Sequence, residues 1–432
     1  MKRNRITRAA LGALVFACAA ACAAPAASQD AAFGKNKVQI KKFEWFVLKT
    51  PHFDINFPGG YRDLAARTGV ILEAGYIKLS NDMSHRVAWR IPVIIYGSHS
   101  DFQQTNVIWD IIPEGVQAFA EPMRKRMVLH FGGSNADYAH TAVHELVHIF
   151  SYDIIYGTLL RSVFSRSMLF PIPLWFMEGL AEYYSSGYDA GGEMFVRDGA
   201  VFDYLSDLDY TYGYMAYKSG QAAIHYLTET YGPGKVLEIM DNVRAQRGSI
   251  GLALENSLGI TSEELSRDWK KAMRRRYWPL YVDKKEPEAY GRRLTDHLKK
   301  HHGMNIKPAF SPDGQYIVYF SDLKGLDGIY LMDAVTGRVE KRLVSGMMST
   351  RFESIRSMNS NLTFSRDGTR IAFVAKSHGL DRLFIVSVPK GKVLQEIEIP
   401  LDFFHSPAWS PTSDTIALVG VVNGFTDPDG QK

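Results

Sequence analysis

The chain has 432 residues, a length typical of two or three domains. Hydrophobic residues make up 46% and charged residues 22%, ordinary values for a folded protein, so disorder is not the default interpretation. The formal net charge is +4, but the four basic residues among the first 28 account for all of it. The remainder is near neutral, which leaves no charge argument for a nucleic-acid partner.

The first 28 residues have the layout of a secretory signal peptide. A basic start runs from Lys2 to Arg8, an alanine-rich apolar run follows from Ala9 to Ala24, and small residues continue to Ser28. The apolar run is too short for a convincing membrane span. We therefore expect an exported protein of the bacterial periplasm or cell envelope, and residues 1–28 are left out of the fold.

Both cysteines, Cys18 and Cys22, lie in this signal region, so disulfides are not expected to stabilise the mature chain. The residues before Cys22 are three alanines, which form a weak lipoprotein-type cleavage site, and Cys18 has a similar context. A lipid anchor at Cys22 is therefore one expectation. Plain cleavage near Ala26 or Ser28 is the alternative that we favour.

The next part of the chain mixes strand and helix patterns. Residues 52–57 alternate between apolar and polar, which predicts a half-buried strand, and strands are also expected at 91–96 and 127–131. Apolar residues at helical spacing predict a helix over 61–83.

The pattern then becomes helical. Thr261 and Glu264 form a capping-box signature at the start of the last helix. A mixed sheet followed by a helical subdomain is an α+β domain, which we bound at 29–285, with a linker at 286–302. The expected helices lie at about 137–153, 177–187, 215–231, 234–245 and 262–277.

Residues 303–432 contain a repeat that appears three times. Its serine recurs after 54 and then 45 residues, and a second strand follows the first two copies at the same offset. Repeats near 45 residues with paired strands and Asp-Gly turns are typical of propeller blades. The three copies are Phe310-Ser311-Pro312-Asp313-Gly314, Phe364-Ser365-Arg366-Asp367-Gly368 and Trp409-Ser410-Pro411.

This repeat resembles that of the TolB-like β-propeller. The resemblance implies an all-β architecture and says little about chemistry; a protein partner at the propeller is one expectation. About two and a half blades are visible, because the residues from Asp427 to Lys432 replace an expected strand. We therefore expect either a longer natural protein or pairing with another chain. We also expect a chain ending near residue 285 to fold alone.

A metal-site motif, His144-Glu145-Leu146-Val147-His148, lies in the first predicted helix after the sheet. Residues four apart share a helix face, so the two imidazoles can bind one ion. Imidazole nitrogens suit zinc, and Glu145 beside the first ligand can take a proton from a zinc-activated water.

A third protein ligand would leave one coordination position open for water. A further histidine six residues after His148 is excluded, because that position is Ile154. The other common choice is a glutamate on a following helix. Glu178 supplies it 30 residues after His148, and Glu182 lies four residues further on the same face.

The two motifs together resemble the gluzincins, zinc metallopeptidases of the peptidase MA type related to thermolysin and the alanyl aminopeptidases. The second motif, around Glu178, reads Trp-x-x-Glu-Gly-Leu-Ala-Glu-Tyr, and the resemblance covers roughly residues 40–280. It implies that Glu178 is the third zinc ligand. It also implies that Glu182 accepts the free ring N–H of His144.

The same resemblance implies a tyrosine that donates to the oxyanion of the tetrahedral intermediate. The segment Tyr217-Lys218-Ser219-Gly220 looks like the Tyr-x-Lys-Gly segment of the aminopeptidase branch, which assigns the role to Tyr217. Tyr212 and Tyr214 are alternatives in the same tyrosine-rich stretch. The Gly-x-Met-Glu-Asn motif of that branch is not matched at 117–122, which favours an endopeptidase.

The sequence therefore predicts a zinc-dependent peptidase with one zinc ion, acting on peptide or protein substrates through a zinc-activated water with Glu145 as the base. The rival hypothesis is a non-catalytic envelope protein that uses the propeller to bind a partner. An intact Glu145 argues against the rival, because a scaffold needs no base.

Overall fold

A computed structural model describes residues 41–108, 112–157, 171–296, 303–323, 325, 327–346 and 351–422. The predicted signal peptide, both cysteines and the tail at 427–432 lie outside these residues. The chain divides into two units; the described residues of the first are 103–108 and 112, and those of the second are 41–102 and the described residues from 113 onward. In the first unit, the Gln103 side-chain amide donates to the Ile112 carbonyl at 2.8 Å. The second unit contains all the elements below.

The predicted mixed sheet is present, with five strands in the order β1-β2-β3-β5-β4. The strands β2, β3 and β5 are parallel to each other, while β1 and β4 pair antiparallel at the two edges. In β2 the buried positions alternate as predicted, with Phe53, Ile55 and Phe57 facing the core. The strands are β1 (Trp45–Lys49), β2 (Phe53–Pro58), β3 (Ile91–Tyr96), β4 (Ala118–Glu121) and β5 (Arg126–His130).

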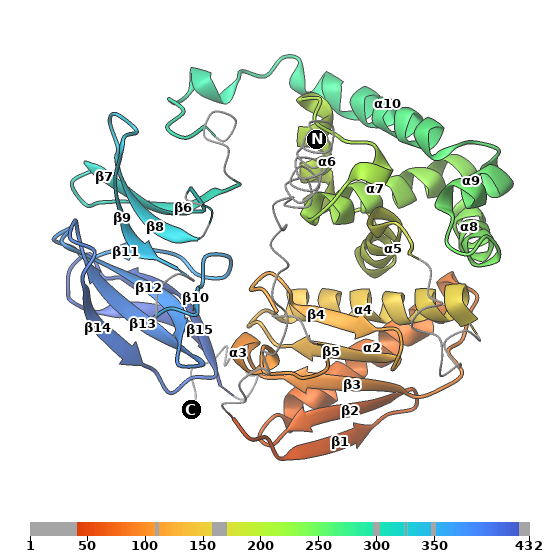
Figure 1. Cartoon of the computed structure of the whole chain (residues 1–432), viewed down its shortest axis with the longest axis horizontal. Coiled ribbons are helices and arrows are strands. Elements are labelled where there is room, and N and C mark those ends of the chain that lie inside the picture. Colours follow the sequence, from red (N-terminus) through yellow and green to blue (C-terminus); the bar gives the residue numbers. More distant parts are fainter. Residues whose placement is uncertain are drawn as a thin grey trace, which may run out of the picture. The chain divides into compact units, whose positions relative to one another are not determined.

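Helices cover the sheet and continue away from it, which confirms the predicted α+β arrangement (Figure 1). The helix α4 packs against α2 and the edge strand β4, α5 packs on α4, and α7 packs on α5. The five later helices expected from the pattern are all found. The helices are α2 (Arg62–Asp82), α3 (His99–Phe102), α4 (Asn135–Tyr156), α5 (Leu174–Ser186), α6 (Ala190–Val201), α7 (Tyr214–Tyr231), α8 (Pro233–Ala245), α9 (Ile250–Leu258) and α10 (Ser262–Tyr281).

Local signals explain several helix starts. Ser134 caps α4 by accepting a hydrogen bond from the Asp137 N–H at 3.2 Å, and Pro173 precedes α5. The predicted capping box is present at α10, where Thr261 and Glu264 each accept from the other's backbone N–H. Three short helices, α3, α6 and α9, were not predicted, because none of them shows a long apolar period.

The helices α5 and α7 touch through their backbones at two glycines. A Cβ on Gly179 would lie 2.5 Å from the Gly220 carbonyl carbon, and a Cβ on Gly220 would collide with the Trp175 carbonyl oxygen. Only residues without a side chain allow this approach. The distance between α5 and α7 is therefore set by this glycine pair.

The C-terminal residues form antiparallel sheets, as the strand pairs predicted. One sheet has four strands in sequence order, the next contains β10 to β14, and the last is the pair β15 and β16. The strands are β6 (Asn305–Phe310), β7 (Tyr316–Ser321), β8 (Gly328–Asp333), β9 (Val339–Ser345), β10 (Ser354–Ile355), β11 (Thr363–Phe364), β12 (Arg370–Ser377), β13 (Leu380–Ser387), β14 (Val393–Glu398), β15 (Phe403–Trp409) and β16 (Ile416–Val421).

The repeated motif forms the same turn each time it occurs. The N–H of Ser311 donates to the Tyr316 carbonyl at 2.9 Å, and Ser365 donates to Arg370 at the same distance. In the first copy, Asp313 accepts the Ser311 hydroxyl and the Gln315 N–H. Gly314 has φ of +71°, the left-handed conformation that favours glycine. The Ser-x-Asp-Gly repeat is thus a repeated turn.

A buried arginine joins β-rich residues to the α3 segment. Arg356 is 1% exposed and pairs with Asp381, with 2.6 Å between Nη2 and Oδ1. The same guanidinium donates to the Ser100 hydroxyl at 2.7 Å and lies 3.2 Å from His99 Nδ1. A chain ending near residue 285 would lose these contacts. The predicted domain boundaries, 29–285 and 303–432, therefore stay a prediction.

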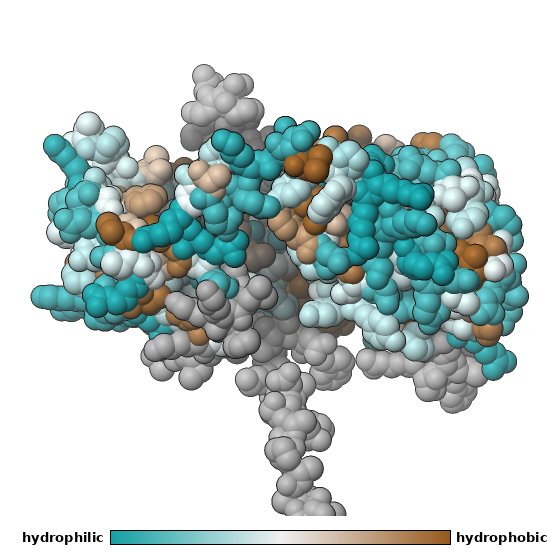
Figure 2. All heavy atoms as spheres, turned by 90° about the horizontal axis from the view of Figure 1, so that it is seen from above, coloured by the Kyte–Doolittle hydropathy of each residue, from teal (hydrophilic) through white to brown (hydrophobic). Residues whose placement is uncertain are grey.

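The face shown in Figure 2 is mainly hydrophilic, with separate apolar areas among the polar ones. Large exposed apolar side chains occur at the end of α10, including Trp278, Leu280 and Val282. Within the described residues, no helix is both long enough and apolar enough to span a membrane.

The glycine contact generates the first prediction. Gly179→Ala or Gly220→Ala should lower the free energy of unfolding by about 1–3 kcal/mol, because a methyl group must push the two helices apart. Chemical denaturation of the purified variants measures this change.

Gly251→Ala is the matched control, since a Cβ there meets nothing closer than the Ser262 hydroxyl at 3.8 Å. It should leave stability unchanged or raise it by up to about 1 kcal/mol. Equal effects at Gly179 and Gly251 would contradict the close contact.

Candidate metal centre

Both histidines of the predicted motif lie on one face of α4. Their rings are 4.9 Å apart between centroids, and both side chains are buried. The neighbouring apolar residues of α4, such as Leu146 and Val147, are fully buried in the core. Core packing therefore holds the helix, and the histidines face away from the sheet toward α5.

Glu178 of α5 faces the two histidines. Its Oε2 atom lies 3.2 Å from His144 Nε2 and 3.3 Å from His148 Nε2. Two ligands about 2.0–2.1 Å from a tetrahedral zinc ion lie about 3.3 Å from each other. The ligand atoms of His144, His148 and Glu178 all lie within 4.8 Å of one another. The three residues proposed as ligands thus meet at one point, and both their chemistry and their spacing fit zinc.

The electrostatics of this cluster favour positive charge. Burial opposes a charged His144, but hydrogen bonds to Glu178 and Glu182 outweigh it and raise the pKa of His144 to about 10. Burial likewise works to raise the pKa of Glu178, yet the neighbouring His148 and His144 lower it strongly. A position flanked by ionised carboxylates in this way suits a cation.

Glu182 lies one helical turn beyond Glu178 and faces the other nitrogen of His144. Its Oε1 is 3.1 Å from His144 Nδ1, a distance at which a carboxylate could fix the orientation of the ring. Burial opposes ionisation of Glu182, but the hydrogen bond with His144 and the Lys218 charge lower its pKa to about 2. His144 is therefore held at both nitrogens by α5 carboxylates.

Glu145 is 6% exposed and lies beside the ligands without joining them. Burial raises the pKa of this carboxyl, while the two histidines and a hydrogen bond from the Ala120 N–H oppose the rise. Ala120 belongs to the edge strand β4. A carboxyl with a raised pKa beside a metal position has the properties of a general base.

Tyr217 approaches the cluster from α7. Its ring stacks on His144 with centroids 5.9 Å apart. Burial and the charges of Glu178 and Glu145 raise its pKa, so the hydroxyl keeps its proton at neutral pH. The alternatives are more exposed, at 57% for Tyr214 and 84% for Tyr212. The structure therefore places Tyr217, of the three tyrosines, against the ligands.

Residues 72–275 match the family model of the Peptidase MA superfamily. This segment is similar to the peptidases of that superfamily. The match confirms the peptidase MA resemblance that the two motifs indicated. No curated protein matches the chain.

Two solved structures illustrate what the chain is similar to. One is an M1 zinc metallopeptidase from Deinococcus radiodurans, with 14% identity over 52% of this chain and 51% of that chain and a TM-score of 0.30. The other is TolB from Acinetobacter baumannii, with 25% identity over 30% of this chain and 28% of that chain and a TM-score of 0.23. The chain thus spans about half of the first structure and under a third of the second.

Two residues near the candidate metal centre were given no role from the sequence. Lys218 places its ammonium group 2.6 Å from Glu182 Oε2, and His140 Nε2 lies 3.8 Å from Glu182 Oε1. His140 precedes His144 by four residues, so helical spacing would have indicated it. Lys218 was named only as part of the Tyr-x-Lys-Gly segment, and its partner Glu182 could not be assigned because that residue lies on another helix.

The second prediction concerns metal content. The purified chain should hold about one zinc ion, and His144→Ala or Glu178→Ala should lose it, since each variant removes one of three protein ligands. Metal analysis after dialysis measures the content.

His225→Gln is the control, because His225 pairs with Glu229 at 3.2 Å and takes no part in the cluster. It should keep its zinc. Normal zinc content in Glu178→Ala would exclude Glu178 as a ligand.

Proposed function

We propose that the chain is a zinc-dependent peptidase in which His144, His148 and Glu178 hold one zinc ion and Glu145 is the general base. One observation carries this proposal: three ligand atoms meet at one point, with a further buried carboxylate beside them. A protein that only binds a partner has no use for that additional carboxylate. The geometry therefore supports a catalytic site over a non-catalytic platform.

The chain's own residues divide the chemistry among them. Zinc bound at this site would polarise the scissile carbonyl and lower the pKa of water. Glu145 would take the proton of the attacking water and deliver it to the leaving amine. The Tyr217 hydroxyl would donate a hydrogen bond to the oxyanion of the tetrahedral intermediate.

The edge strand β4 supports an endopeptidase. Among the described strands, β4 is the last of its sheet, and it pairs only with β5. An extended peptide can bind such an edge as an additional strand. The Ala120 N–H of β4 is close enough to Glu145 to lower its pKa, so a peptide lying along β4 would pass the base. The one carboxylate in residues 117–122, that of Glu121, accepts from Arg126 Nε at 2.6 Å, so it is already paired and is not directed at a free amino end.

We also propose that the C-terminal sheets are blades of a β-propeller that captures a protein partner, and that the protein is exported to the periplasm or cell envelope. The turns shared by the first two C-terminal sheets support the proposal that these sheets are propeller blades. Mass spectrometry of the native N-terminus distinguishes a lipidated Cys22 from plain cleavage near Ser28. An intact Met1 in native cells would contradict export.

The third prediction tests the base. Glu145→Gln should reduce hydrolysis of casein about 10²–10⁴-fold while zinc content stays normal, because the amide cannot accept the proton of water. A peptide-release assay with and without chelator measures the rate. Activity close to that of the wild type would show that Glu145 is not the base.

The fourth prediction tests the oxyanion donor. Tyr217→Phe should lower kcat about 10²–10³-fold with normal zinc content, as expected for one lost donor. Tyr214→Phe is the matched control, since its ring stacks on Tyr217 but is largely exposed. If Tyr214→Phe loses the activity instead, the role belongs to Tyr214.

A further inference from the structure

We propose that Lys218 is a positioning residue of the metal centre, which acts by fixing the Glu182 carboxylate so that Glu182 in turn orients the ligand His144. This inference rests on the proposed zinc peptidase function. Lys218 would touch neither substrate nor metal. Its effect would pass through two contacts, from Lys218 to Glu182 and from Glu182 to His144.

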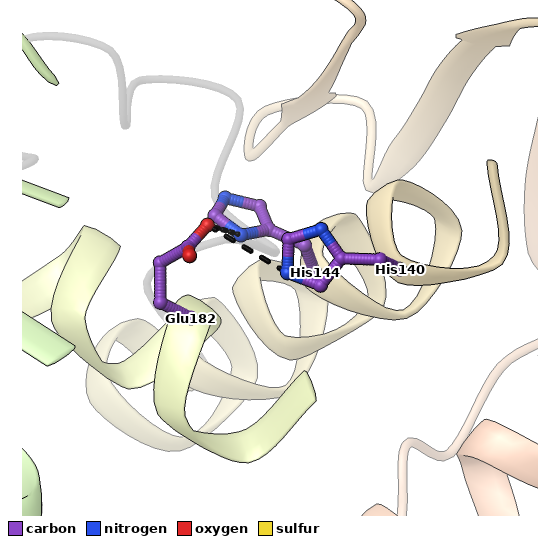
Figure 3. A group of neighbouring side chains, drawn as sticks. All are labelled: His140, His144 and Glu182. Atoms are coloured by element: carbon purple, nitrogen blue, oxygen red, sulfur yellow. Dashed lines mark ion pairs between the residues drawn. The ribbon is translucent and has the colours of Figure 1, made fainter. Parts of the chain in front are cut away.

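The two oxygens of Glu182 have different partners. Oε2 accepts from the Lys218 ammonium at 2.6 Å, and Oε1 lies 3.1 Å from His144 Nδ1, within ion-pair distance. Figure 3 shows the carboxylate on α5 facing the His144 ring on α4. Because Lys218 binds one oxygen, the carboxylate cannot rotate without breaking a charged hydrogen bond. The other oxygen therefore stays directed at His144.

Burial makes this ion pair important. Glu182 is 4% exposed and Lys218 is 6% exposed, so water cannot replace either partner. A buried charge left without its partner is strongly unfavourable. The centre contains three acidic side chains, Glu145, Glu178 and Glu182. A divalent cation together with the Lys218 ammonium would balance their three negative charges.

The position of Lys218 on α7 also links two parts of the site. Tyr217 and Lys218 are consecutive, and Glu178 and Glu182 are one helical turn apart on α5. Tyr217 lies close enough to Glu178 for that carboxylate to raise its pKa, while Lys218 binds Glu182. Since Gly220 on the next turn allows the close approach of the helices, one segment of α7 reaches both α5 carboxylates.

His140 offers an alternative role for Glu182. His140, His144 and Glu182 could together hold a second metal ion, since their ligand atoms lie within 4.8 Å of one another (Figure 3). The Lys218 ammonium, 2.6 Å from Glu182, argues against this, because it would repel a cation bound to the same carboxylate. His140 Nε2 is also 3.8 Å from Oε1, beyond hydrogen-bond distance.

The experiment measures zinc affinity of the full chain by competition with a chelating fluorophore, without any hydrolysis assay. Lys218→Met should weaken zinc binding about 10- to 100-fold, the effect expected when the partner of a ligand histidine is disturbed. Glu182→Gln should weaken it to a similar extent. The double variant should be no weaker than Glu182→Gln, because both changes interrupt the same contacts. Lys218→Arg should recover most of the affinity.

Lys235→Met is the matched control, because Lys235 forms an ion pair with Glu238 at 2.8 Å on α8, outside the cluster. Its zinc affinity should not change. If Lys218→Met does not fold, the double variant decides, since it removes both buried charges together.

Wild-type affinity in folded Lys218→Met, or in the double variant, would overturn the inference while leaving the proposed peptidase intact. A second zinc ion that is lost in His140→Phe would also overturn it, because Glu182 would then be a ligand. A wild-type chain that binds no zinc would overturn both proposals.

Discussion

The contact between Gly179 and Gly220 determines how the centre is assembled. It brings α5 and α7 to backbone distance, and each helix carries functional side chains within one turn of its glycine. Glu178 and Glu182 on α5 thereby meet Tyr217 and Lys218 on α7. A larger residue at either glycine would move one pair of side chains away from the other. The packing of α5 on α7 therefore sets the geometry of the centre.

The electrostatics follow from that packing. The helices bury two α5 carboxylates and Glu145 of α4 in a region with little water, where each charge needs a partner. Histidines, a lysine and a backbone N–H supply these partners. The pKa values of Glu145 and Glu178 consequently move in opposite directions, although the charges of the same two histidines act on both carboxylates. This divergence separates a residue suited to move protons from one suited to bind a cation.

In the C-terminal sheets, structure depends on local sequence more than on the packing of helices. There the repeated Ser-x-Asp-Gly turn specifies local structure almost completely, because hydroxyl, carboxylate and left-handed glycine satisfy the turn within a few residues. The turn does not indicate a chemical function, because its polar side chains are already engaged in hydrogen bonds within the turn. What the β-rich residues contribute to the peptidase domain depends on long-range contacts such as that of Arg356 with Ser100.

The sequence by itself determined the α+β order and the limits of most helices. It also indicated the candidate ligands, because helical spacing places His144 and His148 on one face and Glu178 and Glu182 on another. It also indicated the repeated turns. Only the tertiary structure decided that Tyr217, rather than Tyr214, lies against the ligands, and that Lys218 pairs with Glu182. These relations join different helices, and a local pattern cannot encode the distance between two helices, which here depends on two glycines in contact.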